Sequence, residues 1–226
     1  MKRLEKKHSL AVRWFHWINF LLLALMVWSG MLIYWANSVY RIGAGPYTLF
    51  RMNLAPATWR RLHVSYRLAE GMSLHFFFMW LFAVNGVLYV LYTAISGQWR
   101  ELVPSRSSVR HAAFTVLHDL HIRREPPPLQ KFNGAQQFAY TAIILMGFGS
   151  LVTGIAIYKP VQFGWLAAVL GGYQTARFFH FWLTVGYVLF FFVHVAQVVR
   201  AGWNNLCSMV IGYELRNGAP PEVSND

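Results

Sequence analysis

Long stretches without acidic or basic side chains alternate along this chain with short basic segments. Four stretches reach the length of about 20 residues that a helix needs to cross the hydrocarbon core of a bilayer. They cover residues 14–35, 72–95, 136–158 and 178–200. Another apolar run, residues 161–172, is too short to span and is expected to be an interfacial loop. The pattern predicts an all-α membrane protein, a four-helix transmembrane bundle forming one domain over residues 1–226.

The distribution of Lys and Arg predicts how this bundle is oriented. Four spans place both termini on one side, together with the connection between the second and third spans. This side carries more Lys and Arg than the other, and cytoplasmic segments are enriched in these residues. Both termini are therefore predicted to be cytoplasmic. On the other side, residues 57–71 have the pattern of an amphipathic helix, and no internal repeat is evident along the chain.

The composition supports a membrane protein and excludes several other classes. Charged residues make up 12% of the chain, against about 25% in soluble domains. The net charge is +12, but the basic residues lie between the apolar stretches, so they are expected to face a membrane surface rather than nucleic acid. The single Cys excludes an intramolecular disulfide, a Cys-ligated iron–sulfur cluster and a covalently attached haem.

Histidines are the ionisable side chains of the apolar stretches. His16, His75, His180 and His194 all lie inside the predicted spans. Ionisable groups are costly in a membrane and point to function, and neutral imidazole is a common ligand of metals, including haem iron. His180 and His194 are separated by nearly four helical turns, so they project from almost the same face of one helix, roughly 21 Å apart. They are expected to serve two different centres.

Each centre then needs a second ligand at a matching depth. His16 lies at the inner end of the first span and matches His194, while His75 lies at the outer end of the second span and matches His180. His63 is the alternative to His75, but it lies outside the apolar stretch among arginines. The four histidines predict two sites with two imidazoles each, whereas histidines that only form hydrogen bonds are the alternative interpretation.

Arginines and glycines near these histidines fit the same picture. Arg13 and Arg177 each precede a histidine of the spans by three positions. They are expected either to pair with haem propionates or to extend toward lipid headgroups. Gly30 and Gly154 leave room beside a flat cofactor, and close packing of helices is an equally good explanation for them.

Several motifs resemble those of the bacterial di-haem b-type cytochromes. This family includes the membrane subunits of nickel–iron hydrogenases, formate dehydrogenases and thiosulfate-reductase-type enzymes. The stretches most like the branch that accompanies periplasmic molybdopterin oxidoreductases are PPPLQKFNGAQQFAYTAI and LVTGIAIYKP. The other motifs that carry the resemblance are RWFHW, WSGMLI, LGGYQTARFFH and the two histidines of the fourth span.

The resemblance implies a ligand set, a function and a location. His16 and His194 would ligate the cytoplasmic-side haem, and His180 and His75 the periplasmic-side haem. Two b-type haems would pass electrons across the bacterial inner membrane between a periplasmic redox subunit, molybdopterin oxidoreductase-like, and the quinone pool. A quinone or quinol would bind near the inner haem. The sequence departs from the family pattern in two ways. The inner connection is long and carries His111, His118 and His121, and two candidate histidines, His63 and His75, lie before and in the second span.

Two other functions are compatible with the sequence. One is a haem-free membrane anchor or carrier in which the histidines only form hydrogen bonds. The other is a self-contained transmembrane reductase of a soluble acceptor, although the segment GAGPYTL lacks the second half of a dinucleotide-binding motif.

Overall fold

Four long helices dominate the computed structural model, which describes residues 2–37, 40–44, 47–52, 56–119, 122 and 134–217. Each is long and apolar enough to cross a membrane, so the prediction of four spanning helices is confirmed. They are α1 (Leu10–Tyr34), α3 (Leu68–Ile95), α6 (Gly134–Tyr158) and α8 (Tyr173–Ala201).

Local groups mark several ends of these helices. Ser9 caps α1, and its side chain accepts a hydrogen bond from the backbone N–H of Val12. Arg67 forms an ion pair with Glu70 in the first turn of α3. Gly202, at a φ of 83°, ends α8 in a conformation that favours glycine.

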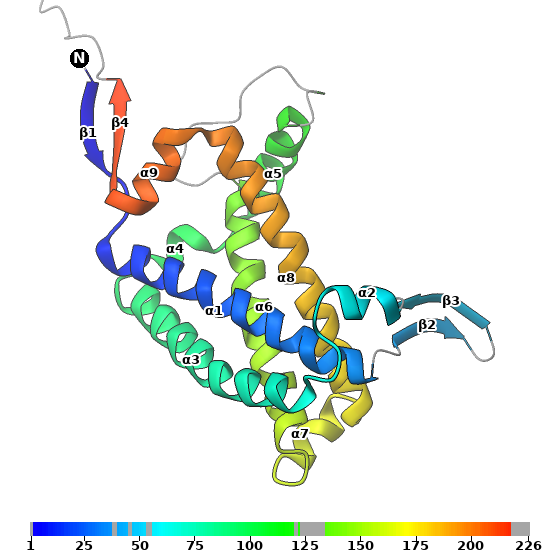
Figure 1. Ribbon diagram of the computed structural model, residues 1–226. Coiled ribbons are helices and arrows are strands. Elements are labelled where there is room, and N and C mark those ends of the chain that lie inside the picture. Colours follow the sequence, from blue (N-terminus) through cyan, green and yellow to red (C-terminus); the bar gives the residue numbers. More distant parts are fainter. Residues whose placement is uncertain are drawn as a thin grey trace, which may run out of the picture.

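The two ends of the described chain meet in a short ribbon. Strand β1 (Lys2–Lys6) pairs antiparallel with β4 (Tyr213–Asn217), which follows the amphipathic helix α9 (Trp203–Ile211). Both chain ends therefore lie at the same end of the helices, here called the terminal end (Figure 1). The opposite end, where α3 and α8 begin, is called the distal end. That the terminal end faces the cytoplasm stays a prediction.

The connections at the distal end contain more structure than the sequence predicted. Between α1 and α3 lie a short 3-10 turn, a β-hairpin and a short helix: η1 (Trp35–Asn37), β2 (Tyr40–Ala44), β3 (Tyr47–Met52) and α2 (Pro56–Arg61). The expected amphipathic helix over residues 57–71 is wrong in extent. His63 and Tyr66 adopt positive φ angles of 54° and 64°, which interrupt the helix before α3 begins.

Short helices also replace predicted loops elsewhere in the chain. Helix α7 (Gly164–Val169) lies in the expected interfacial loop between α6 and α8. The connection between α3 and α6 contains α4 (Trp99–Leu102) and α5 (Arg106–Asp119). The small buried cores lie at the distal end, where α2 packs on α1 and α7 packs between α6 and α8.

The spanning helices form two hairpins, α1 with α3 and α6 with α8, which cross one another (Figure 1). Close backbone approach is concentrated within each hairpin. In the first hairpin, side-chain hydrogen bonds join the helices at three levels. They link Ser9 to Tyr92 (3.0 Å), Asn85 to Asn19 (2.8 Å) and Ser29 to His75 (2.9 Å). Such polar links and small residues hold helices together in lipid, where apolar burial gives little advantage.

The two hairpins share one plan, which the sequence did not reveal as a repeat. Helices α1 and α6 each have 25 residues, and α3 and α8 have 28 and 29. Ser29 and Thr153 each stand five residues before the end of their helix, and each precedes a glycine. His75 and His180 each stand seven residues after the start of theirs. The expectation of no internal repeat is therefore wrong at the level of helices.

Substitution of Gly71 by Ala tests the packing within the first hairpin. A Cβ at Gly71 would lie 2.6 Å from the Cβ of Leu32 and 3.1 Å from its carbonyl carbon, so α1 and α3 would have to separate. We expect Gly71→Ala to lower the thermal unfolding midpoint in detergent, at a cost of about 1–3 kcal/mol. Gly86→Ala in the same helix meets nothing within 4 Å and should unfold at or above the wild-type midpoint. Equal midpoints for the two variants would contradict this packing.

Candidate functional site

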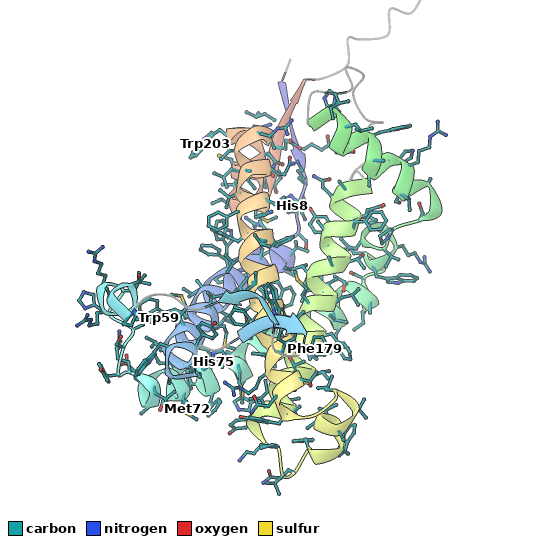
Figure 2. All side chains as sticks on the ribbon, turned by 90° about the vertical axis from the view of Figure 1, so that its right-hand side faces the viewer. His8, Trp59, Met72, His75, Phe179 and Trp203 are labelled. Atoms are coloured by element: carbon teal, nitrogen blue, oxygen red, sulfur yellow. The ribbon has the colours of Figure 1, made fainter. Side chains whose placement is uncertain are left out.

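The four histidines of the spans form two pairs, each with one ring from each hairpin. His16 of α1 faces His194 of α8 with ring centroids 6.0 Å apart, and these are called the terminal pair. His75 of α3 faces His180 of α8 with centroids 6.2 Å apart, and these are called the distal pair. Figure 2 shows His75 and Met72 toward the distal end and His8 and Trp203 toward the terminal end. The structure thus brings together the residues that the sequence matched by depth.

The spacing within each pair suits one metal ion between two imidazoles. A metal–imidazole nitrogen bond is about 2 Å long, and the ring centre lies roughly another 1 Å beyond the nitrogen. Two such ligands on opposite sides of one ion therefore have centroids about 6 Å apart. Both observed separations, 6.0 and 6.2 Å, match this value.

One helix, α8, supplies a histidine to both pairs. His180 and His194 are separated along it by about 21 Å, at 1.5 Å per residue. One ion cannot serve both pairs over this distance. Within the part of the chain that the structure describes, no group of three or more His, Cys, Asp or Glu side chains gathers to hold a metal. Two separate two-histidine sites are what this arrangement offers.

The distal pair is held by hydroxyl groups and flanked by glycines. The Nδ1 atom of His75 lies 2.9 Å from the Ser29 hydroxyl, and that of His180 lies 2.9 Å from the Thr153 hydroxyl. A Cβ on Gly30 would stand 3.6 Å from Cε1 of His75. The equivalent Cβ on Gly154 would stand 3.4 Å from Cε1 of His180. The missing side chains leave room beside both rings, as the sequence suggested for a flat cofactor.

The terminal pair is surrounded by aromatic rings instead. His194 stacks on Phe190, with centroids 5.8 Å apart and planes 6° apart. His16 makes an edge contact with Trp17 at 5.3 Å. Nearby, Phe20 of α1 and Phe191 of α8 stack at 6.2 Å. This pair therefore lies in an apolar, aromatic environment.

Aromatic rings also fill much of the contact between the two hairpins. These contacts join α1 to α8 and α3 to α6 and α8. The pairs are Tyr34–Phe181 at 4.8 Å, Phe76–Tyr158 at 4.6 Å and Phe82–Tyr187 at 6.4 Å. The layer between the hairpins thus consists mainly of flat, polarisable groups, which pack well against a planar cofactor.

The shared plan of the hairpins explains why the terminal end carries one histidine pair. His16 stands six residues into α1, and Tyr140 stands six residues into α6. His194 stands 21 residues into α8, and Tyr89 stands 21 residues into α3. Tyr89 and Tyr140 occupy the places in α3 and α6 that correspond to the terminal pair, so the second possible position at this end holds two phenols.

The remaining sequence-predicted residues lie apart from the pairs. His63, the alternative to His75, is exposed in the turn after α2. His111 and His118 belong to α5, and His121 lies outside the described residues. The structure therefore places His75, and not His63, opposite His180.

Both candidate arginines make contacts at helix ends. Nη1 of Arg13 donates to the carbonyl of Val210 at the end of α9, while its Nε is buried without a partner. Nη1 of Arg177 donates to Gln174 at 3.2 Å, and its guanidinium lies 5.9 Å from the centre of the Tyr173 ring. The Nε of Arg13 lies against Gly212, where an added Cβ would stand 3.3 Å from it. A role with propionates stays a prediction for both.

Sequence reasoning missed Ser29 and Thr153 as the hydroxyl partners of the distal pair. The motifs WSG and TG drew attention to their glycines only. The sequence did contain a pattern that could have indicated them. A hydroxyl residue directly precedes Gly30 and Gly154, which lie at the same depth in two apolar stretches.

Comparison with known proteins assigns the family. The family described as prokaryotic cytochrome b561 matches residues 7–212. A protein of Azospira oryzae, named as a putative protein-methionine-sulfoxide reductase subunit YedZ1, is 29% identical over 213 residues, which are 94% of this chain and 99% of that protein. The chain therefore belongs to the prokaryotic cytochrome b561 family of multi-pass inner-membrane electron-transport proteins that bind b-type haem.

Proposed function

We propose that this protein holds two b-type haems and carries electrons between the quinone pool and a periplasmic oxidoreductase of the molybdopterin type. The observation that carries the proposal is the presence of two histidine pairs, with ring centroids 6.0 and 6.2 Å apart, at opposite ends of one bundle. His16 and His194 would hold one haem, and His75 and His180 the other.

The residues around each pair fit haem better than other metal centres. Each site offers two imidazoles, and the described residues add no third His, Cys, Asp or Glu to either pair. A zinc or non-haem iron site needs more protein ligands than two. Gly30 and Gly154 leave space beside the distal rings, and aromatic side chains line the layer between the hairpins. The two phenols at the remaining terminal-end position favour two haems rather than three.

The chain holds its ligands on a rigid frame and shapes their surroundings. A b-type haem held by each pair would supply reversible one-electron exchange at its iron, and two histidine ligands would leave no open position for oxygen. Because His180 and His194 stand on one continuous helix, α8 fixes the separation between the two centres. Aromatic contacts between the hairpins, such as Tyr34–Phe181 and Phe82–Tyr187, give these positions largely apolar surroundings.

A quinone is proposed to exchange electrons at the terminal end. An apolar pocket lies there between α3, α4 and α6. Its lining suits an isoprenoid tail and includes Val90, Ala94, Trp99, Ile144 and Leu145. The Tyr89–Tyr140 pair belongs to the same region of α3 and α6. The pocket thus supports quinone binding near the terminal pair and away from the distal pair.

The proposed partner is a periplasmic reductase docked at the distal end. The Azospira oryzae relative is named as a subunit of a putative protein-methionine-sulfoxide reductase, which supports an enzyme of that class. Exposed cations at the distal end, including Arg60, Arg61 and Lys159, suit an acidic docking surface. Membership of a haem-binding family argues against the haem-free anchor, and no described feature favours a self-contained reductase.

Haem quantification tests the ligand set. We expect two low-spin b-type haems per purified chain, measured by the reduced-minus-oxidised spectrum and by the pyridine haemochrome against protein. His194→Ala should retain one haem, because the terminal pair loses an axial ligand. His63→Ala is the control and should retain two, since His63 is exposed outside the pairs. If His194→Ala retains two haems per chain, the assignment of His194 as a ligand is wrong.

Reduction by a quinol tests the position of the quinone site. Menadiol should rapidly reduce the haems of the wild-type protein. In His16→Ala we expect the remaining haem to be reduced by dithionite but only slowly by menadiol, because the centre nearest the quinone is lost. His75→Ala should keep rapid reduction of its remaining haem, measured by stopped-flow absorbance. The reverse pattern would place quinone exchange at the distal end.

Reoxidation of the haems tests the partner. Methionine sulfoxide, added with periplasmic extract to reduced spheroplast membranes, should reoxidise haem in the wild type and in His16→Ala. The same addition should fail in His180→Ala, because the distal centre is missing. Extract from tungstate-grown cells, in which molybdenum enzymes are inactive, is the control. Reoxidation at the wild-type rate with that extract would argue against a molybdopterin partner.

A further inference from the structure

Two buried hydroxyl groups contact the distal pair in the same way. The Oγ of Ser29 lies 2.9 Å from Nδ1 of His75, and the Oγ1 of Thr153 lies 2.9 Å from Nδ1 of His180. Ser29 is fully buried, and Thr153 is 3% exposed. Each hydroxyl comes from the helix that pairs with the helix of its histidine, so the contact also joins the two helices of a hairpin.

The direction of the first hydrogen bond follows from the other contacts of Ser29. Its Oγ donates to the carbonyls of Leu25 at 2.8 Å and Met26 at 3.1 Å. A hydroxyl has one proton, and these carbonyls use it. Toward His75 the hydroxyl can therefore only accept, so Nδ1 carries the proton.

Thr153 repeats this arrangement in the second hairpin. Its Oγ1 donates to the carbonyls of Gly149 at 2.7 Å and Ser150 at 3.3 Å. The same proton assignment follows, with Nδ1 protonated and Nε2 holding the free lone pair. The two hairpins differ in sequence, but both place a hydroxyl group against Nδ1 of a histidine at the same depth.

We propose that Ser29 and Thr153 are positioning residues for the distal haem. By accepting a hydrogen bond from Nδ1–H, each fixes the tautomer in which Nε2 is available to the iron and orients the ring. A hydrogen bond from the other ring nitrogen also makes a histidine a stronger donor to its metal. A stronger donor stabilises ferric iron, so the two bonds lower the reduction potential of the distal haem. The terminal pair contacts the rings of Trp17 and Phe190 instead.

This proposal rests on the distal pair as haem ligands, and its test uses separate redox titrations of the two haems. Ser29→Ala and Thr153→Val should raise the midpoint potential of the distal haem and leave that of the terminal haem unchanged. Transfer of the distal haem to apomyoglobin should become about 10- to 100-fold more favourable. Thr153→Ser keeps the hydroxyl and should behave as the wild type.

Thr115→Val is the matched control for the loss of a buried hydroxyl. Thr115 is 5% exposed, and its Oγ1 also donates to a carbonyl of its own helix, that of His111 at 2.9 Å. It lies in α5, in the connection between α3 and α6, and contacts neither histidine pair. Thr115→Val should therefore leave both potentials and the transfer of haem unchanged.

The outcomes separate this inference from the proposed function. An unchanged distal potential in both Ser29→Ala and Thr153→Val, with two haems present, overturns the inference alone. Loss of the distal haem in Thr153→Val supports it if Thr153→Ser retains the haem with the wild-type potential. The same loss in Thr153→Ser would indicate a packing role and overturn it. Retention of two haems in His75→Ala and His180→Ala would overturn the proposed function itself.

Discussion

The absence of a hydrophobic driving force between helices in lipid is the constraint on which this structure depends. Helices surrounded by acyl chains gain little by burying apolar surface against each other. Their association relies instead on close backbone approach and polar contacts. Gly71 lets α3 approach Leu32 of α1, and the Asn85–Asn19 hydrogen bond joins the same helices. These specific links account for the formation of two tight hairpins rather than four evenly packed helices.

The candidate cofactor sites lie in the looser contact between the two hairpins. Both histidine pairs form across this contact, and each needs one residue from the first hairpin and one from the second. Helix α8 carries a histidine of both pairs, so it sets their separation. Under the proposed function, each hairpin would position its ligands, and the aromatic side chains between the hairpins would pack against a planar group. At the distal pair, one contact serves both the packing of the hairpin and the orientation of a histidine. The Ser29–His75 hydrogen bond joins α1 to α3 and also orients the His75 ring.

The shared plan of the hairpins gives the bundle a partial two-fold regularity. His75 and His180 occupy equivalent places and face each other, whereas the place equivalent to His16 in α6 is held by Tyr140. The distal pair therefore consists of two residues at equivalent positions in the two hairpins. The terminal pair joins α1 to α8, and the equivalent combination of α6 with α3 carries no histidine pair. This difference makes the surroundings of the two sites unlike, with hydroxyl groups at one and aromatic rings at the other. If each pair holds a haem, as we propose, these unlike surroundings would give the two haems different reduction potentials.

The sequence by itself determined the four spans and the depth of each histidine, because helix length and rise are set by backbone hydrogen bonding and by bilayer thickness. It also placed His180 and His194 on one face of one helix. Only the tertiary structure decided that His75, and not His63, faces His180, because the turn at His63 depends on backbone angles that no periodicity encodes. The hydroxyl partners of the distal pair emerged in the same way. Ser29 and His75 are 46 positions apart, and only the packing of α1 against α3 brings them into contact.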